Sequence, residues 1–147
     1  MTVDVTTEVV IDRPVDLVAS YAANPDNAPE WYQNIESVTW ETPPPLVEGS
    51  RVAFVARFLG RRLEYTYSMS HYEPGSQLVM TTEQGPFPME TTYTWTDAGD
   101  NATRMTLRNR GQPSGFSRFT GPMMVSAMRR ANEKDLANLR SILEKRA

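Results

Sequence analysis

The sequence of 147 residues contains no cysteine and only one histidine, His71. The lack of cysteine excludes disulfides, thiolate nucleophiles and cysteine-ligated metal centres. The single histidine excludes a multi-histidine metal site and a catalytic histidine pair. This composition leaves a metal site made of carboxylates alone open, and we expect no metal and no cofactor. Any acid–base chemistry must depend on His71, on carboxylates or on tyrosine hydroxyls.

Strong positive charge and long apolar runs are also missing. Fifteen Lys and Arg stand against 18 Asp and Glu, giving a formal net charge of −3, which argues against nucleic-acid binding. No run approaches the roughly 18 apolar residues of a membrane span. The first twelve residues alternate in polarity, unlike a signal peptide. The expected protein is cytoplasmic and of bacterial type, and it is a monomer or a homodimer.

The dominant pattern is an alternation of apolar and polar residues, which is typical of half-buried strands. It begins between Thr2 and Asp12, where most odd-numbered residues are apolar. It resumes later in the chain, divided by turns rich in proline and glycine. Six more strands are expected at Ile35–Glu41, Arg51–Phe58, Arg62–Tyr72, Gln77–Glu83, Met89–Thr96 and Thr103–Arg110. Their short connections predict an antiparallel meander.

Three other segments have helical features. Short helices are expected between Pro14 and Asn24 and at Asn27–Tyr32, and a long one at Gly121–Arg146. About 25 residues rising about 1.5 Å each would span the whole sheet. At 100° steps, one stripe of the long helix contains Met124, Val125, Met128, Asn132, Asp135, Leu139, Ile142 and Leu143. We predict one α+β domain over residues 1–147, with a seven-stranded curved antiparallel sheet wrapped around this helix.

Three stretches resemble a known superfamily. They are VVIDRPVDLVASYAANPDNAPEWYQNIESV, SMSHYEPGSQLVM and TTYTWTDAGDNATRMTL. Together with the order of elements, they resemble the START-like or SRPBCC superfamily, which includes polyketide cyclase/dehydrase-type proteins. The resemblance implies a helix-grip fold whose cavity, between sheet and helix, holds a lipid, a polyketide or another hydrophobic compound. It implies no particular reaction.

Candidate site residues follow from strand parity and from the helix stripe. If the odd-numbered side chains of the expected strand Arg62–Tyr72 face inward, they line the cavity. The rest of the wall would come from the strand Met89–Thr96, from the long helix and from an aromatic residue at the entrance of the cavity. The predicted ligand-binding residues are Trp31, Tyr65, Tyr67, Met69, Tyr93, Met128 and Asn132. Trp31 and Tyr32 would form a lid, and the alternative is that Trp31 anchors its short helix to the sheet. Phe116 and Phe119, between two glycines, are predicted to cover one end.

His71 and Asp135 are the predicted catalytic residues. An inward His71 would supply an imidazole that titrates near neutral pH, although a hydrated histidine at a strand end is the alternative. Asp135 lies in an otherwise apolar stripe, so its carboxyl must be paired, hydrated or protonated. Its partner is either a structural group or a ligand.

Three functions fit this pattern. The first is binding or carrying of a hydrophobic small molecule. The second is a cofactor-independent polyketide cyclase or aromatase that uses the acid–base groups of the same cavity. The third is an accessory subunit that docks another protein on the outer face of the sheet.

Overall fold

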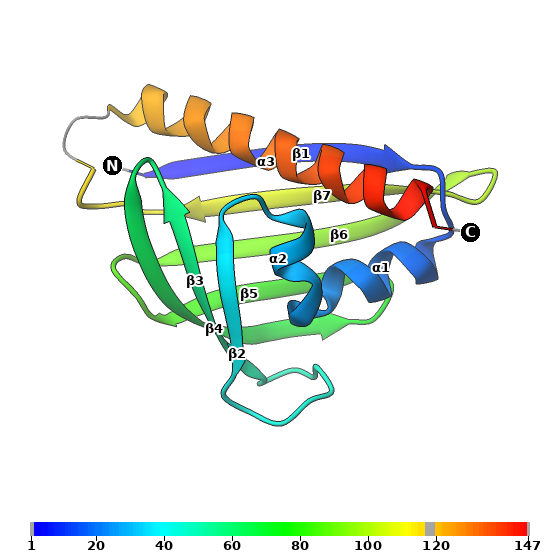
Figure 1. The fold of residues 1–147 in the computed structure, drawn as a ribbon, viewed down its shortest axis with the longest axis horizontal. Helices are drawn as coiled ribbons and strands as arrows, with labels where there is room; N and C mark the ends of the chain where they lie inside the picture. The colour runs from blue at the N-terminus through cyan, green and yellow to red at the C-terminus, as the bar shows by residue number, and fades with distance from the viewer. Residues whose placement is uncertain (1, 117–119, 147) are drawn as a thin grey trace.

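The computed structural model describes residues 2–116 and 120–146. Its strands are β1 (Val3–Ile11), β2 (Ile35–Trp40), β3 (Arg51–Phe58), β4 (Arg61–Glu73), β5 (Gln77–Gln84), β6 (Met89–Gly99) and β7 (Ala102–Gly111). Its helices are α1 (Val15–Ala23), the 3-10 turn η1 (Pro25–Asn27), α2 (Ala28–Trp31) and α3 (Gly121–Glu144). The predicted α+β helix-grip architecture is confirmed (Figure 1).

All seven strands belong to one antiparallel sheet in the order β1-β7-β6-β5-β4-β3-β2. Strands β2 to β7 form the predicted meander. The first strand joins the last one, with Val3 opposite Gly111 and Ile11 opposite Thr103. In Figure 1 the sheet curves so that α3 crosses over β1 and β7, while β2 and β3 rise on the other side. This curvature creates the space in which the site lies.

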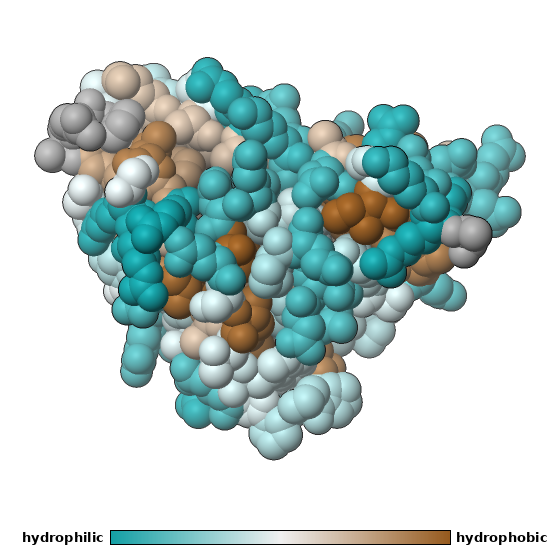
Figure 2. Space-filling view, viewed as in Figure 1, coloured by the Kyte–Doolittle hydropathy of each residue, from teal (hydrophilic) through white to brown (hydrophobic). Residues whose placement is uncertain are grey.

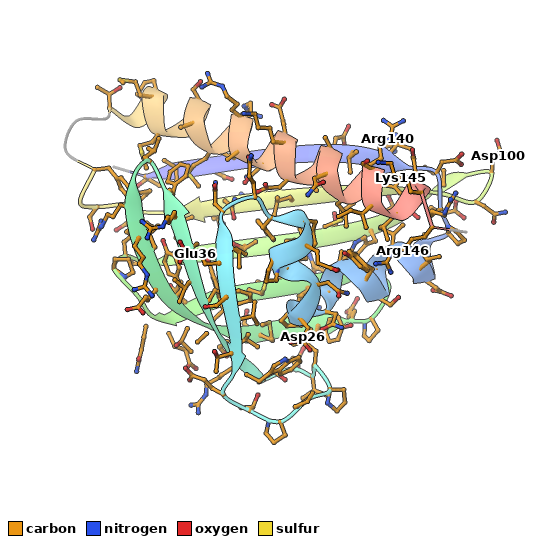
Figure 3. The ribbon with its side chains drawn as sticks, viewed as in Figure 1. Asp26, Glu36, Asp100, Arg140, Lys145 and Arg146 are labelled. Carbon is orange, nitrogen blue, oxygen red and sulfur yellow. The ribbon has the colours of Figure 1, made fainter. Side chains whose placement is uncertain are left out.

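The two faces of the sheet have opposite character. In β1 the side chains of Val3, Val5 and Ile11 are buried, whereas the alternate positions are exposed. On the outer face, Arg108 pairs with Asp4 at 2.6 Å. The charged side chains labelled in Figure 3 likewise lie around the outside of the molecule. Apolar side chains are therefore directed toward α1, α2 and α3.

Helix α3 begins at an N-cap threonine, as helix preferences predict. The Thr120 hydroxyl accepts a hydrogen bond from the Met123 amide at 3.4 Å, and Pro122 lies in the first turn. The buried residues of α3 are Met124, Met128, Asn132, Asp135, Leu136, Leu139 and Leu143. Six of these seven were predicted, and Leu136 was not. Within the two described ranges, no helix is long and apolar enough to span a membrane.

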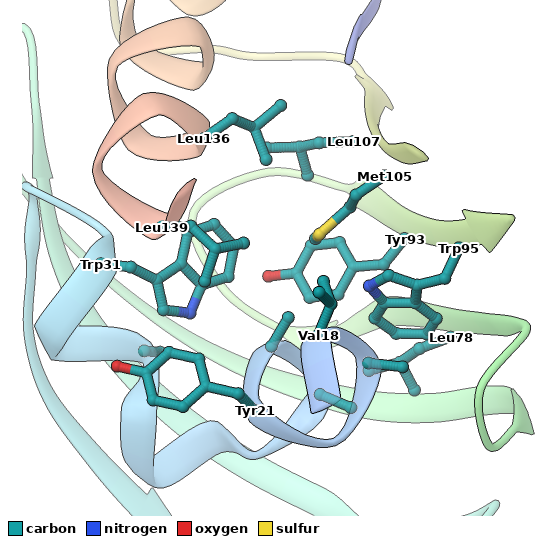
Figure 4. Packing of buried hydrophobic residues seen from close by; sticks show 14 of the residues in the cluster. Val18, Tyr21, Trp31, Leu78, Tyr93, Trp95, Met105, Leu107, Leu136 and Leu139 are labelled. Carbon is teal, nitrogen blue, oxygen red and sulfur yellow. The ribbon is translucent and has the colours of Figure 1, made fainter. Parts of the chain in front are cut away.

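The buried apolar side chains form two separate clusters. The larger one packs α1, α2 and the C-terminal half of α3 on the sheet, and includes Trp31, Met105 and Leu139 (Figure 4). The smaller one packs the N-terminal half of α3 and includes Phe87 and Met124. Between Met128 and Leu136, the buried positions of α3 are the polar residues Asn132 and Asp135. The core is thus divided where the helix stripe becomes polar.

Replacing Leu139 by alanine tests how much the packing of α3 on the sheet contributes to the free energy of unfolding. Leu139 is 0% exposed, so the Leu139→Ala variant should lose about 2–5 kcal/mol of unfolding free energy. Leu17 in α1 is 38% exposed, and Leu17→Ala should cost about 1 kcal/mol or less. Urea unfolding of both variants measures the difference. Equal costs would contradict the packing of α3 described here.

Candidate functional site: a cavity between the sheet and the long helix

A cavity of about 170 Å³ lies between the sheet and α3. Its wall takes side chains from both apolar clusters, so the cavity occupies their boundary. Its aromatic residues are Tyr32, Phe54, Phe58, Tyr65, Tyr67, Phe87 and Tyr93, and its methionines are Met80, Met89, Met124 and Met128. In Figure 2, brown hydrophobic atoms are visible between hydrophilic ones over β2 and β3, the strands that contribute Ile35 and Phe58 to the wall.

Six of the nine predicted site residues lie on this wall. They are Tyr65, Tyr67, Tyr93, Met128, Asn132 and Asp135. The two β4 tyrosines stack with their ring centroids 5.7 Å apart, so that strand presents a broad aromatic surface to the cavity. Their contact with a ligand stays a prediction, as does any catalytic role of Asp135.

Trp31 and Met69 are buried, but neither lies on the cavity wall. Both belong to the larger apolar cluster. The ring of Trp31 packs on its neighbour Tyr32, with a centroid separation of 4.1 Å. Tyr32 takes the cavity position that was expected for Trp31, because α2 is a single turn whose rotation depends on tertiary packing. No group among the described residues accepts a hydrogen bond from Trp31 Nε1.

The predicted inward position of His71 is wrong. Met69 pairs with Met80 and His71 with Val79, so Ser70 is an extra residue in β4. Such a bulge reverses the alternation of side chains along a strand. His71 therefore has a side chain 41% exposed, with Nδ1 at 3.2 Å from Glu48 and Nε2 at 3.3 Å from Glu73. It lies outside the cavity, and Tyr72 packs against the core instead.

The polar groups of the cavity gather near the middle of α3. Asp135 is 3% exposed, and its Oδ1 accepts a hydrogen bond from the Gln33 amide at 3.0 Å. The hydroxyls of Tyr32 and Tyr93 are hydrogen-bonded to each other. Asn132 is 6% exposed, and no described group is a partner for its Nδ2. Across the described ranges, no group of three or more His, Asp or Glu residues is arranged to hold a metal ion.

Burial changes the protonation of these groups. Desolvation raises the pKa of Asp135 to about 6, although the hydrogen bond from Gln33 opposes the shift. Desolvation also raises the pKa values of Tyr32, Tyr67 and Tyr93 above the usual 10. Near neutral pH the tyrosines are therefore neutral hydrogen-bond donors, whereas Asp135 exchanges its proton close to the operating pH.

Side chains of α3 also hold α2 beside the cavity. The Asn138 amide donates to the carbonyl oxygens of Glu30 at 3.1 Å and Trp31 at 3.2 Å. These carbonyls lie at the end of α2, where no further helical turn supplies donors. Asp135 holds the next segment through Gln33. Asn138 was not among the predicted site residues, and its one signal in the sequence was a second amide on the same side of the helix as Asp135.

Near the start of α3, Phe58 and Phe87 lie on the cavity wall and Phe116 packs against them from outside the wall, so covering of the cavity by Phe116 stays a prediction. Phe116 is buried, and its ring lies 5.9 Å from Phe58 and 5.8 Å from Phe87. The guanidinium of Arg61 lies 5.3 Å from the Phe116 ring and donates to the Ser114 carbonyl at 2.6 Å. Phe119, also predicted to cover this end, lies outside the described residues. Phe54 and Phe58 share the buried parity of β3, which was a usable sequence signal.

Comparison with known proteins assigns this arrangement to a class. The sheet and the long helix have the helix-grip fold. The START superfamily protein from Mycobacterium smegmatis matches with a TM-score of 0.84 and 14% identity over 97% of each chain. The Zhui aromatase/cyclase from Streptomyces sp. R1128 matches with a TM-score of 0.79 and 16% identity, over 99% of this chain and 96% of that one. At these identities the matches show the fold alone.

A match to a protein-family model establishes the family of the chain. Residues 2–144 match the family described as polyketide cyclase / dehydrase and lipid transport, and the chain belongs to it. A plant structure, the major latex-like protein 151 of Panax ginseng, has a TM-score of 0.74 and 11% identity over 95% of this chain and 96% of its own. No curated protein sequence matches the chain.

The buried carboxyl of Asp135 predicts a specific pH dependence of stability. Its pKa rises from 3.8 to about 6 on folding, so the folded protein holds the proton more tightly than the unfolded chain does. The resulting stability is present below about pH 4 and is lost as pH rises through about 6. This shift in pKa corresponds to a change of at most about 3 kcal/mol in the free energy of unfolding.

The Asp135→Asn variant keeps an oxygen for Gln33 and cannot ionise. At pH 8 it should be more stable than the wild type by about 1–3 kcal/mol, and the difference should shrink toward zero at pH 4. Urea unfolding at both pH values measures this, with exposed Asp16→Asn as the control. A difference between Asp135→Asn and wild type that stays constant with pH would contradict the desolvation of Asp135.

Proposed function

We propose that this protein binds a small hydrophobic molecule in the cavity between the sheet and α3. The observation that carries the proposal is an apolar, largely aromatic and methionine-lined cavity between the sheet and α3. Protein interiors are close-packed, and voids larger than a water molecule are few. A cavity maintained at this size is therefore best explained as space for a ligand.

The cavity volume sets the size of the ligand. An apolar cavity of about 150 Å³ in another protein stays dry and binds benzene. The present cavity, of about 170 Å³, accordingly has room for a ligand with one ring and a short substituent. A lipid or a longer polyketide requires side chains to move. Met80, Met89, Met124 and Met128 are unbranched and flexible, so they are suited to such movement.

Asp135 favours a second candidate function, ring closure by proton transfer. Its carboxylate takes a proton from the acidic methylene of a β-keto compound, and the methylene carbon then forms a bond to a carbonyl carbon of the same molecule. The proton ends on the former carbonyl oxygen. A pKa of about 6 suits a general base near neutral pH, and the cavity would hold both carbons in contact. His71 has no part in this reaction.

The third function, docking of a partner protein on the outer sheet face, gains no specific support. The arginines of β7 on that face are already paired within the sheet. Arg104 lies 3.8 Å from Glu8, Arg108 lies 2.6 Å from Asp4, and Arg110 lies 2.9 Å from Glu90. This function stays a prediction from the sequence.

Filling the cavity tests the binding proposal. Ala131 lies on the wall, so Ala131→Leu should reduce the affinity for ethylbenzene at least about tenfold by occupying ligand space. Ala137→Leu makes the same change at an exposed position of α3 outside this cavity and should leave the affinity unchanged. Titrations followed by amide NMR shifts measure both. No shift of any cavity amide in the wild type would refute the proposal.

Mass spectrometry tests the cyclase candidate. Incubation with a linear triketo ester, in which the methylene beside the ester and the far ketone carbon can close a six-membered ring, should give a cyclised product that has lost water. Asp135→Asn should slow its formation at least about a hundredfold. His71→Ala is the control and should form product at the wild-type rate. Equal rates for Asp135→Asn and the wild type would remove Asp135 as the base.

A further inference from the structure

Asn132 has a buried hydrogen-bond donor with no partner in the part of the chain that the structure describes. Its side chain lies on the cavity wall and is 6% exposed. Among the described residues, none accepts a hydrogen bond from Nδ2. An unmade hydrogen bond of this kind is costly, and the great majority of buried polar groups in folded proteins are paired. The partner of Asn132 is therefore expected in the cavity.

The electrostatic surroundings of Asn132 exclude an anionic partner. Asp135 follows three residues later on the same helix face and also lies on the wall. Among the described residues, Arg57 is the one Lys or Arg on the wall. Its side chain is 58% exposed and pairs with Glu36 at 2.5 Å. Above about pH 6, a carboxylate or phosphate beside Asn132 would therefore meet the Asp135 charge, and no unpaired cation of a described wall residue would compensate it.

The remaining polar groups of the wall also match a neutral acceptor. Burial keeps the hydroxyls of Tyr32 and Tyr93 protonated, and they bond to each other. In such a pair one hydroxyl keeps a hydrogen for a further acceptor. Thr91 and Asn109 also lie on the wall, and the Thr91 hydroxyl donates a hydrogen bond of 2.8 Å to Asn109 Oδ1. Of the wall's side-chain atoms, Asn132 Nδ2 is thus the fully buried one that has no hydrogen-bond partner among the described residues.

We propose that the cavity selects neutral carbonyl compounds, and that the carbonyl oxygen of the ligand accepts a hydrogen bond from Asn132 Nδ2. This proposal rests on the function proposed above and narrows its ligand class. The apolar body of the ligand packs against the aromatic and methionine side chains, and its volume is close to that of an aryl ketone. Hydrocarbons fit the space but leave Asn132 unpaired, and carboxylates are repelled.

Three probes of similar shape separate these cases. Acetophenone has a ring and a ketone, ethylbenzene lacks the oxygen, and benzoate carries a charge. Wild-type protein should bind acetophenone about tenfold more tightly than ethylbenzene, because one hydrogen bond forms and one buried donor is satisfied. Benzoate should bind more weakly than either at pH 8. Titrations followed by amide NMR shifts provide the three dissociation constants.

Asn132→Leu removes the donor and keeps a side chain of similar size. The variant should lose the tenfold preference and bind acetophenone and ethylbenzene equally. It should also have a higher melting temperature than the wild type when empty, because an unpaired buried amide has been replaced by an apolar group. Ser126→Leu, at an exposed position of the same helix, is the matched control and should keep the preference.

The outcomes distinguish this proposal from the one on which it rests. Equal wild-type affinities for acetophenone and ethylbenzene would overturn the role of Asn132 while leaving hydrophobic binding intact. Tighter binding of benzoate than of acetophenone would overturn the choice of a neutral ligand. Binding of none of the three probes would refute both proposals. Because these comparisons use the wild type, they hold even if Asn132→Leu fails to fold.

Discussion

The polar interruption in the buried stripe of α3 is the constraint on which the rest of the structure depends. On either side of it, Met124, Met128, Leu139 and Leu143 bury apolar side chains against the sheet. At Asn132 and Asp135 the helix presents groups that cannot join an apolar core without hydrogen-bond partners. The core therefore divides into two clusters, and the space between them is the cavity. We expect these two residues to reduce stability, and both lie on the cavity wall.

One side chain, that of Asp135, belongs both to the cavity wall and to the contacts that hold the segment after α2. Asp135 lies on the cavity wall and also accepts the Gln33 amide just after α2, while Asn138 holds the end of α2 itself. A ligand that changes the environment of Asp135 changes one of the bonds that hold α2 in place. Tyr32 lies next to these contacts and pairs with Tyr93 across the cavity. Ligand binding and the position of α2 are thus expected to be linked.

The fold was predictable because alternation and helix periodicity are local patterns that survive along whole elements. The strand and helix limits differ from prediction by a few residues at most, as at Met89–Gly99. The site was predictable where these patterns run unbroken, as for Tyr65, Tyr67 and Asn132. The orientation of His71 was predicted wrongly because the polarity of the residues around Ser70 does not reveal the bulge. Trp31 was predicted to lie on the cavity wall, where the structure has Tyr32, because a single helical turn is too short for periodicity to indicate its orientation.

The central claim is that the divided core contains real, apolar, accessible space, and crystallography under xenon pressure tests it most directly. Xenon binds dry apolar cavities and makes no hydrogen bonds. The account predicts a xenon atom in contact with Met80, Phe87 and Met128, with the surrounding side chains unmoved. It would be contradicted by side chains that collapse to fill this space, or by ordered waters and no xenon between the sheet and α3.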